Sequence, residues 1–440
     1  MKYMSVGFVI LCTAAFFTAG CAMFSDGGAS SVLNNRQIFS SVPSEPVYSA
    51  NSSFMSGISE ANQIVHPAGL HLSLEIPLQP SRIQGVAAPS VDMNGNADLS
   101  ADDASAVYDK ATLTEDVNLR GNVLIKGYLV VAPQATLRVE PGAVIRFAAT
   151  GTKNTSARLV IQGRIHAVGT ADKPIVFTSD RSTPARGDWG GISLVASEKR
   201  NQLEHCRIEY ANTGLETQFS TVSLKMVSVS WAHTGFLMRD SVTHINGGVF
   251  SNSDIGFEMH DSELDMKELT VSACKRGIVM FKSAASISSC KITNNEQFGL
   301  LSDECRIRIT AVELSGNGYG ADLNGGEGQI IATSFLNNRE AALHLAGTRV
   351  KVNRCRFFDN NQDALRLEDG RALVWGNSFS GNKGFNLHNS GREDVNALQN
   401  WWGSSDPAAI SQKIYDAVRD PRSGSVQHFP WLSEKPVFLQ

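Results

Sequence analysis

The sequence predicts an all-β chain: a right-handed parallel β-helix solenoid with three sheets per coil and a short C-terminal capping helix. The first observation is a repeated phrase, in which Gly or Ala is followed by an apolar, an outward-facing and a second apolar residue. It reads GLET at 214, GFLM at 235, GFEM at 256, GIVM at 277, GLLS at 299, GADL at 320, ALHL at 342, ALRL at 364 and GFNL at 384. The spacings are 21, 21, 21, 22, 21, 22, 22 and 20 residues, and such a period indicates a solenoid.

The second observation is the alternation of apolar and polar residues inside each repeat. Segments such as LDMKELTVS and ASISSCKITNN alternate like half-buried strands, and helical periodicity is missing. A coil of 21 or 22 residues accommodates three short strands, and successive coils stack about 4.8 Å apart through parallel hydrogen bonds. Because the six-residue rhythm of left-handed solenoids is absent, we expect the right-handed form, with about 13 coils and a length of about 60 Å.

Composition divides the 440 residues into four segments. These are a signal peptide (1–21), a flexible Ser-, Ala- and Asn-rich tether (22–110), the β-helix (111–402) and a C-terminal cap of one helix and a final strand (403–440). The net charge is −4, and neither a basic excess nor a nucleic-acid motif is present. We therefore expect no nucleic-acid partner.

The N-terminus predicts export and a lipid anchor. Lys2 precedes an apolar stretch, residues 4–17, that is too short to span a bilayer. The following TAGC resembles a bacterial lipoprotein signal, which implies that Cys21 is acylated and becomes the mature N-terminus. An ordinary secretory signal cleaved near Ala22 is the alternative. The resemblance implies a membrane partner through the lipid anchor. An inner-membrane retention signal would have Asp directly after the cysteine, where this sequence has Ala22. The resemblance therefore also implies an outer-membrane location, facing the periplasm or the exterior.

The segment after residue 400 predicts the capping helix. Asp406 suits the N-cap, and Pro407 suits the first helical position. Ile410, Ile414 and Val418 recur every four residues as one apolar stripe. We expect this stripe to cover the open end of the stack.

Three tryptophans, Trp401, Trp402 and Trp431, are expected to fill the space around the stripe. Terminal repeats of a solenoid need such a lid. Sugar binding by the tryptophans is the alternative.

Five cysteines outside the signal region are spread singly: Cys206, Cys274, Cys290, Cys305 and Cys355. An exported protein permits disulfides, but this spacing is no disulfide framework, and the sequence does not say which thiols are bonded. Three of them, Cys206, Cys290 and Cys355, lie about 14 Å or more apart at the stacking distance and cannot bond to one another. We interpret these three as buried, inert thiols. Because five is an odd number, at least one of the five thiols is free.

Residues 112–435 resemble the right-handed β-helix repeat proteins, the pectin-lyase-like superfold. The resemblance rests on GYLVVAPQATLRVEPGAVIRF, LVIQGRIHAVGTADKPIVFTSD, GDWGGISL and LEHCRIEYANTG, and on the closing NWWG and VQHFPWL. It extends to the periplasmic NosD-like group, which is associated with copper-enzyme maturation. The superfold hosts many functions, so the resemblance implies the fold and no single activity.

Met238, Met259 and Met280 fall at one position of three successive coils. Stacked thioethers are possible Cu(I) ligands. The same position in later coils is taken by Ser302, Leu323, Leu345, Leu367 and Leu387. We therefore predict an inward core row and no metal site.

The catalytic candidates lie on neighbouring coils: Arg239, Asp240, His260, Asp261 and Lys282. Asp240 and Asp261 share one register, about 4.8 Å apart. Paired carboxylates beside basic groups are suited to bind Ca²⁺ and to assist lyase or hydrolase chemistry on an acidic polysaccharide. The alternative, which we favour, is a solvated corner where charges satisfy one another. The sequence lacks the Gly-His-Gly and Arg-Ile-Lys pair of polygalacturonases and the Tyr-Gly-Phe-Asp-Pro-His run of alginate epimerases.

The outward position of the phrase shows neither an aromatic track nor charge of a single sign. It is occupied by Glu216, Leu237, Glu258, Val279, Leu301, Asp322, His344, Arg366 and Asn386. The leading hypothesis is an envelope lipoprotein whose non-catalytic β-helix is a binding or scaffold surface for a polysaccharide or an envelope protein, without a cofactor. The alternatives are a polysaccharide lyase, epimerase or hydrolase, with Ca²⁺ as its only cofactor, and a NosD-like metal-maturation accessory.

Overall fold

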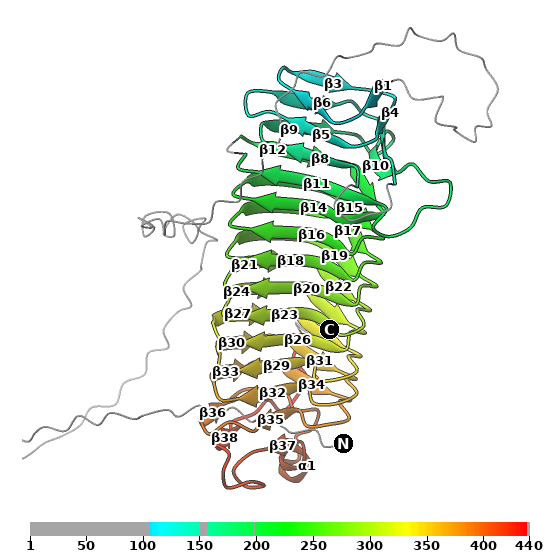
Figure 1. The fold of residues 1–440 in the computed structure, drawn as a ribbon. Helices are drawn as coiled ribbons and strands as arrows, with labels where there is room; N and C mark the ends of the chain where they lie inside the picture. Colours follow the sequence, from blue (N-terminus) through cyan, green and yellow to red (C-terminus); the bar gives the residue numbers. More distant parts are fainter. Residues whose placement is uncertain (1–105, 150–155, 198, 438–440) are drawn as a thin grey trace, which may run out of the picture. The chain divides into compact units, whose positions relative to one another are not determined.

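A computed structural model describes residues 106–149, 156–197 and 199–437. These residues form a parallel β-solenoid of about 13 turns with one short helix near the C-terminus, which confirms the predicted fold class (Figure 1). The signal peptide, the lipidation candidate Cys21 and the tether up to residue 105 lie outside the described residues. Within the described part of the chain, no helix has the length and apolar content needed to cross a bilayer.

A 14-stranded sheet receives one strand from each turn, and all its strands pair in parallel. Its strands are β2 (Ala111–Leu113), β5 (Tyr128–Val131), β8 (Arg158–Ile161), β11 (Trp189–Val195), β14 (Ala211–Gln218), β16 (Thr234–Arg239), β18 (Ile255–His260), β20 (Arg276–Phe281), β23 (Phe298–Asp303), β26 (Tyr319–Asn324), β29 (Leu343–Ala346), β32 (Leu365–Glu368), β35 (Leu387–Asn389) and β37 (Ile414–Tyr415). This sheet faces the viewer in Figure 1.

A 24-stranded sheet contains two ladders, which complete three strands per turn. The second ladder comprises β3 (Val117–Leu119), β6 (Thr136–Val139), β9 (Arg164–Val168), β12 (Asn201–Glu204), β15 (Thr221–Ser230), β17 (Val242–Ser251), β19 (Glu263–Ser272), β21 (Ala284–Ser288), β24 (Arg306–Thr310), β27 (Glu327–Ile331), β30 (Arg349–Asn353), β33 (Arg371–Trp375), β36 (Val395–Asn396) and β38 (Val426–Gln427). The third ladder adds β1 (Ala106–Tyr108), β4 (Asn122–Ile125), β7 (Val144–Phe147), β10 (Ile175–Ser179), β13 (Cys206–Glu209), β22 (Lys291–Thr293), β25 (Glu313–Ser315), β28 (Ser334–Leu336), β31 (Arg356–Phe358) and β34 (Ser378–Ser380).

The two ladders merge where β15, β17 and β19 are ten residues long. Each of these strands bends at residues with positive φ: Met226 (52°) in β15, Gly247 (69°) and Gly248 (119°) in β17, and Glu268 (56°) in β19. At the N-terminal end, β1 lies inside the segment 22–110, so residues 106–108 are already part of the solenoid.

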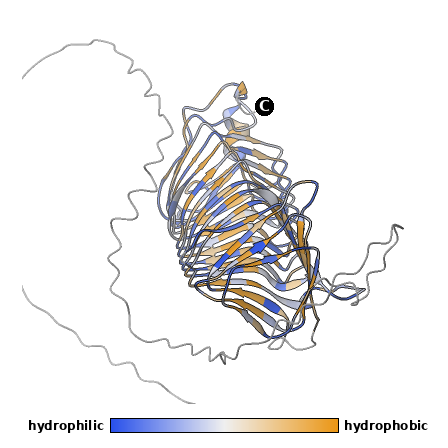
Figure 2. Cartoon of the chain, turned by 90° about the horizontal axis from the view of Figure 1, so that it is seen from above, coloured by the Kyte–Doolittle hydropathy of each residue, from blue (hydrophilic) through white to orange (hydrophobic). Residues whose placement is uncertain are grey.

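The interior consists of columns of apolar side chains, one residue per turn. Figure 2 shows hydrophobic and hydrophilic residues alternating along the strands of the stacked turns. Met238, Met259 and Met280 pair in register and are fully buried, which confirms the predicted core row. A second column stacks the rings of Phe335, Phe357, Phe379 and Trp402, with centroids 4.8, 4.8 and 4.9 Å apart.

The predicted register of the last phrase, GFNL at 384, is wrong by two residues. Arg366 pairs with His388, and Leu365 pairs with Leu387. Gly384 lies in the preceding turn, and Asn386 takes the buried position that Gly or Ala holds in other turns. The Asn386 amide accepts from the Asn382 amide and donates to the Trp402 carbonyl, which is why it points inward.

The C-terminal helix is shorter than predicted. Helix α1 (Pro407–Gln412) begins at the N-cap Asp406, whose carboxylate accepts from the Ala408 and Ala409 N–H groups. Ile410 is buried as expected. The expectation that Ile414 and Val418 continue the same helical stripe is wrong.

The chain leaves the helix to pair β37 with β35, so Ile414 is buried as a strand residue. The buried Asp416 carboxylate then accepts from the Val418 and Val426 N–H groups. This turn leaves the Val418 side chain 91% exposed. Of the three tryptophans, Trp402 is buried at the end of the ring column, which fits the lid.

Buried hydrogen-bonded ladders run along the turns. One consists of Asn295, Asn317, Asn338, Asn360 and Asn382, all buried. Asn338 shows the pattern: its Oδ1 accepts from the Asn317 backbone N–H at 3.1 Å, and its Nδ2 donates to the Leu314 carbonyl at 3.1 Å and to Asn360 Oδ1 at 3.0 Å. A second ladder consists of Ser220, Ser241, Ser262 and Ser283, each hydroxyl after the first accepting a backbone N–H from the preceding turn. Buried backbone groups at the turns are thereby satisfied.

The cysteines extend these ladders and are not bonded to one another. All five in the described residues are buried and free, which confirms the interpretation of three of them as buried thiols. Cys305 accepts from the Ser283 N–H at 3.5 Å, and the Cys274 N–H donates to Asn295 Oδ1 at 3.1 Å. Burial raises the pKa of Cys206 and Cys355 to about 12, so these thiols stay protonated and unreactive.

We predict that Asn338→Ala lowers the free energy of unfolding by about 2 kcal/mol or more, because it leaves the buried Asn317 N–H without its side-chain acceptor and removes the donor to the Leu314 carbonyl and to Asn360 Oδ1. Urea unfolding followed by circular dichroism measures this loss. The matched control is Asn361→Ala, an exposed neighbour expected to stay within about 0.5 kcal/mol. Equal losses in the two variants would contradict a stabilising ladder.

Candidate functional site

The predicted charged corner exists as a column of turn residues. Asp240, Asp261 and Lys282 follow β16, β18 and β20 and have φ of 46°, 47° and 46°. The preceding residues, Arg239 and His260, are paired in register. Burial, and the neighbouring charge of Asp261, raise the pKa of Asp240. One carboxyl of the pair therefore holds its proton more strongly than a free aspartate does.

The basic candidates do not converge on this carboxyl pair. The Arg239 guanidinium lies 2.8 Å from Glu216 Oε1, and His260 Nε2 lies 2.9 Å from Glu258 Oε1. Lys282 Nζ lies 3.9 Å from an oxygen of Glu304, with both side chains largely exposed. Each base is thus paired with a different acid. Among the described residues, no group of three or more His, Cys, Asp or Glu is arranged to hold a metal ion.

A second set of polar side chains follows the outward row of the 14-stranded sheet. With the register corrected, the row ends in Asp322, His344, Arg366, His388 and Tyr415, on five successive strands. We call these five residues the polar row. In the five preceding strands the row mixes charged and apolar residues: Glu216, Leu237, Glu258, Val279 and Leu301.

His344 is the centre of the polar row. Its Nδ1 lies 2.9 Å from Asp322 Oδ1, and its Nε2 lies 3.5 Å from Glu368 Oε1, which is also 3.0 Å from Arg366 Nε. The hydrogen bond to Asp322 raises the pKa of His344, although burial opposes the charge. Its Nε2 is buried without a hydrogen bond. The row therefore places an imidazole that holds its proton more strongly than a free histidine between two carboxylates.

Asp363 and aromatic rings complete the other end of the row. His388 Nδ1 lies 2.7 Å from Asp363 Oδ2, and the Phe385 N–H donates to Asp363 Oδ1. Burial opposes ionisation of Asp363, but these hydrogen bonds outweigh it and lower its pKa. The rings of His388 and Tyr415 lie 4.3 Å apart, and Phe385 meets Tyr415 edge-on at 5.4 Å. This end combines fixed charge with an aromatic surface.

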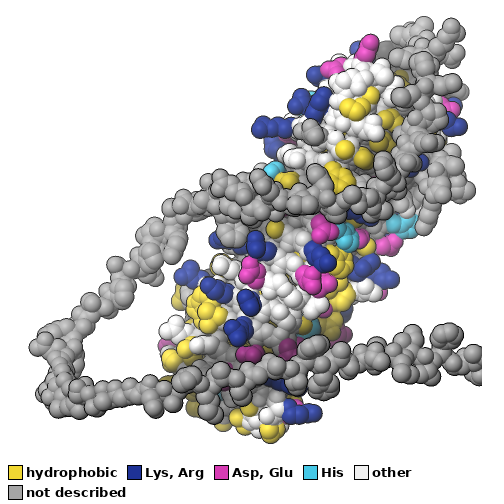
Figure 3. All heavy atoms as spheres, turned by 60° about the vertical axis from the view of Figure 1, so that its left-hand side comes forward, with side chains coloured by type: hydrophobic (Ala, Val, Ile, Leu, Met, Phe, Trp, Pro, Cys, Tyr) yellow, Lys and Arg dark blue, Asp and Glu magenta, His cyan; other side chains and the backbone are white. Residues whose placement is uncertain are grey.

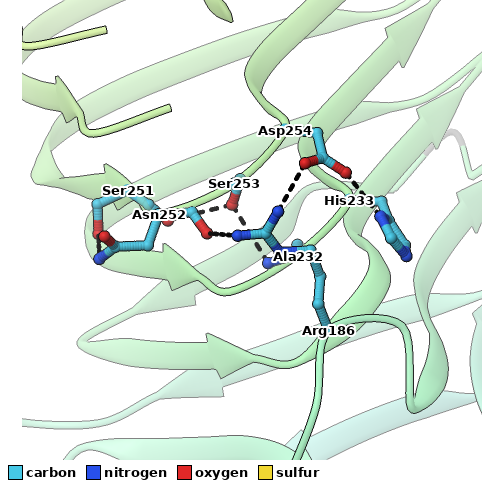
Figure 4. Close-up of polar contacts among 7 residues, drawn as sticks. All are labelled: Arg186, Ala232, His233, Ser251, Asn252, Ser253 and Asp254. Carbon is cyan, nitrogen blue, oxygen red and sulfur yellow. Dashed lines mark hydrogen bonds and ion pairs between the residues drawn. The ribbon is translucent and has the colours of Figure 1, made fainter. Parts of the chain in front are cut away.

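A third polar cluster lies at the edge of the solenoid, where a loop folds over the turns (Figure 4). Arg186 binds Asp254 Oδ1 at 2.6 Å and the Asn252 carbonyl at 2.8 Å, and His233 binds the other Asp254 oxygen at 2.7 Å. Beside it is a cavity of about 640 Å³ that is also lined by Lys275. The cluster fastens the loop to later turns, and its charged groups are largely paired.

Two members of the polar row, His388 and Tyr415, were not predicted from the sequence. Arg366 lies 22 residues after His344, and His388 lies 22 residues after Arg366. The incorrect phrase at 384 obscured this spacing. Tyr415 was hidden because its segment reads as helix, and only the pairing of β37 with β35 places it beside His388.

The protonation of His344 predicts a pH-dependent stability. Because the folded-state pKa is raised above 6.5, the contribution is complete below about pH 6.5 and is lost as the pH rises through the folded-state value. In Asp322→Asn the main cause of the shift is gone, so the fall in unfolding free energy with rising pH should shrink. Urea unfolding across this pH range measures it. The control His166→Gln, at an exposed position, should keep the wild-type pH dependence, and an Asp322→Asn variant that also keeps it would contradict the assignment.

Comparisons with known proteins agree with the architecture. The model described as a pectate-lyase like beta helix domain matches residues 111–230, and that of a right handed beta helix region matches residues 216–349 and 260–401. No curated protein matches the chain.

Similar solved structures are distant. The periplasmic alginate epimerase AlgG has 13% identity and a TM-score of 0.33, over 72% of this chain and 76% of that chain. The A-module of the Azotobacter vinelandii mannuronan C-5 epimerase AlgE4 has 14% identity and a TM-score of 0.30, over 75% of this chain and 90% of that chain. ORF18 of Geobacillus virus E2 has 12% identity and a TM-score of 0.24, over 71% and 54%. Likenesses this weak carry no argument about activity. From its stacked parallel strands and the matched β-helix models, the chain is a right-handed β-helix repeat protein.

Proposed function

We propose that this protein is a non-catalytic polysaccharide-binding protein of the cell envelope, with the polar row as its binding face. The observation that carries the proposal is the corrected row itself: aspartate, histidine, arginine, histidine and tyrosine stand on five successive strands of one sheet. The corrected register adds His388 and Tyr415 to Asp322, His344 and Arg366.

The chemistry of the row suits a sugar chain. Hydroxyl groups need both donors and acceptors, which the paired charges of Asp322, His344 and Arg366 supply. Tyr415 and Phe385 add ring faces and edges for the apolar sides of sugar rings. Strands about 4.8 Å apart repeat these groups along a line, so an extended polymer can contact several of them.

Rigidity favours binding at this face. His344 and Asp322 are only 17% and 20% exposed, and His388 and Asp363 only 17% and 15%, so packing and ion pairs hold these side chains in place. A preorganised surface loses little conformational entropy when it binds. The ligand would meet groups already fixed by the sheet.

The proposal includes a location for the protein, which rests on the lipoprotein signal predicted at its N-terminus. Acylation at Cys21 would anchor the chain to the outer membrane and place the solenoid in the periplasm or at the cell surface. No cofactor and no nucleic acid enters this function.

Binding is tested on an array of acidic and neutral oligosaccharides, followed by calorimetry with the best ligand. We expect Arg366→Ala/Tyr415→Ala to weaken binding at least tenfold, since it removes a charged donor and an aromatic ring from the row, while Ser223→Ala, at an exposed position of β15, should leave binding unchanged. Wild-type affinity in the double variant, or no binding to any glycan, would refute the proposal.

An enzyme acting at the corner is the second candidate. The observation in its favour is the raised pKa of Asp240 beside Asp261, since an acid that keeps its proton next to an ionised carboxylate can share general acid and general base roles. The substrate class would be an acidic glycan, with Ca²⁺ as the cofactor.

This candidate predicts cleavage or epimerisation of a uronate polymer by the wild-type protein, and its loss in Asp261→Asn. Product analysis by chromatography and NMR, with and without Ca²⁺, measures both. Ser262→Ala is not a suitable control because that hydroxyl belongs to a ladder, so Lys267→Ala on the exposed face of β19 is used instead. A wild-type protein inert on a panel of acidic glycans would remove the candidate.

A further inference from the structure

The outer face of the second ladder carries a lattice of cations. In β24, β27, β30 and β33 two outward columns run along the solenoid, one of Arg306, Glu327, Arg349 and Arg371 and one of Arg308, Gln329, Lys351 and Leu373. All eight residues are exposed. We call the five cations of these columns the basic face. Figure 3 shows Lys and Arg side chains gathered on this side of the solenoid.

Most of this charge has no partner among the described residues. Arg306 pairs with Glu327 at 3.1 Å. Within the described residues, the side chains of Arg308, Arg349, Lys351 and Arg371 make no hydrogen bond or ion pair. Acidic side chains in the adjoining turns have other partners. Glu304 lies near Lys282, and Asp369 accepts a hydrogen bond from the Arg392 N–H.

Like charges also face each other. Arg349 and Arg371 are paired directly in register on β30 and β33. Such a cross-strand pair of equal sign is destabilising unless an anion lies between or above the two groups. The net charge of the whole chain is −4, so the basic face is a local excess rather than general basicity.

The same columns are different in the first half of the solenoid. On β15, β17, β19 and β21 they contain Thr221, Val242, Glu263, Ala284, Ser223, His244, Asp265 and Ser286, without a lysine or arginine. Arg138 on β6 belongs to the second column as well, but it pairs with Asp116 at 2.9 Å. From β15 onward, the cations of these columns begin at β24.

Apolar and aromatic side chains border the cations. Leu373 lies in the second column and is 38% exposed. The third outward column holds Ile331 and Trp375, both partly exposed, on either side of Asn353. Tryptophan beside Arg and Lys is typical of surfaces that meet the headgroup layer of a membrane.

We propose that the basic face binds the anionic headgroups of a lipid membrane. The phosphate groups of the lipids would neutralise Arg308, Arg349, Lys351 and Arg371, and Leu373 and Trp375 would enter the interfacial layer. A membrane fits better than a single soluble polyanion because the cations form a two-dimensional array with an apolar border on the open face of a sheet.

This contact would orient the solenoid. The columns run along the stack, so binding through them lays the stack along the membrane. A lipid anchor at Cys21 would supply a second attachment, and one acyl signal together with a basic patch is a combination that holds proteins stably on membranes. The proposal does not depend on the polar row.

The experiment uses the chain without residues 1–21, which lacks the acylation cysteine and the apolar leader and retains the whole buried core, from Leu113 to Val426. Vesicles of phosphatidylcholine alone and of phosphatidylcholine mixed with phosphatidylglycerol are sedimented with the protein. We expect binding to the mixed vesicles only, weakening as salt is added. The variant Arg349→Glu/Lys351→Glu/Arg371→Glu should bind at least tenfold more weakly.

The matched control reverses three exposed lysines elsewhere, Lys126→Glu/Lys267→Glu/Lys383→Glu, so that both variants have the same net charge. The control should bind like the wild type, and thermal melts should show that both triple variants are folded. Three outcomes would overturn the proposal. The first is equal loss of binding in the two variants, and the second is equal binding to both kinds of vesicle. The third is no vesicle binding together with tight binding of soluble polygalacturonate through the basic face. Because vesicle binding is measured without any glycan and both variants leave the polar row intact, its failure is distinguishable from failure of glycan binding at that row.

Discussion

The structure depends on one constraint: a residue at a given place in one turn must hydrogen-bond and pack against its counterpart in the next turn. Backbone ladders enforce this along the strands, and buried side-chain ladders enforce it at the turns, where Asn338 links the turns before and after it. An amide is suited to that place because it accepts one backbone N–H and donates to a carbonyl at the same time. A chain that satisfies this condition at every turn needs no other source of order.

The same constraint explains why function-bearing groups occur in lines. An inward position repeats as a core column, as the methionines and the phenylalanine rings show. An outward position repeats with the same spacing but without a packing requirement, so its chemistry is free to vary from turn to turn. The change along one row from Leu301 to Asp322 and His344 is therefore informative, because packing does not demand it.

Much of this architecture could be predicted from the period and the alternation of residues, including the buried methionine row. The polar ladders could not, because buried Ser, Asn and Cys look like turn residues when each repeat is read alone. The last phrase was misplaced because a glycine in a turn happened to precede two apolar residues. Asn386, predicted to face outward, is therefore buried, and His388 takes the outward position. Val418 was misplaced because a period of four describes a helix only while the backbone stays helical, and here the helix ends at Gln412 and strand β37 follows. Asp416 then accepts from the Val418 and Val426 N–H groups in a turn.

The sheets of the solenoid face different directions, so two groups of polar residues can lie on separate surfaces. The polar row lies on the 14-stranded sheet and the basic face on the second ladder, so the two point in different directions from the same turns. Arg366 and Arg371 illustrate this: they are five residues apart, yet one lies beside Glu368 on the first face and the other stands among cations on the second. A solenoid held to a membrane through one face would leave the other free to meet a ligand in solution. The turn of the chain between β32 and β33 thus converts a short separation in sequence into two independent surfaces.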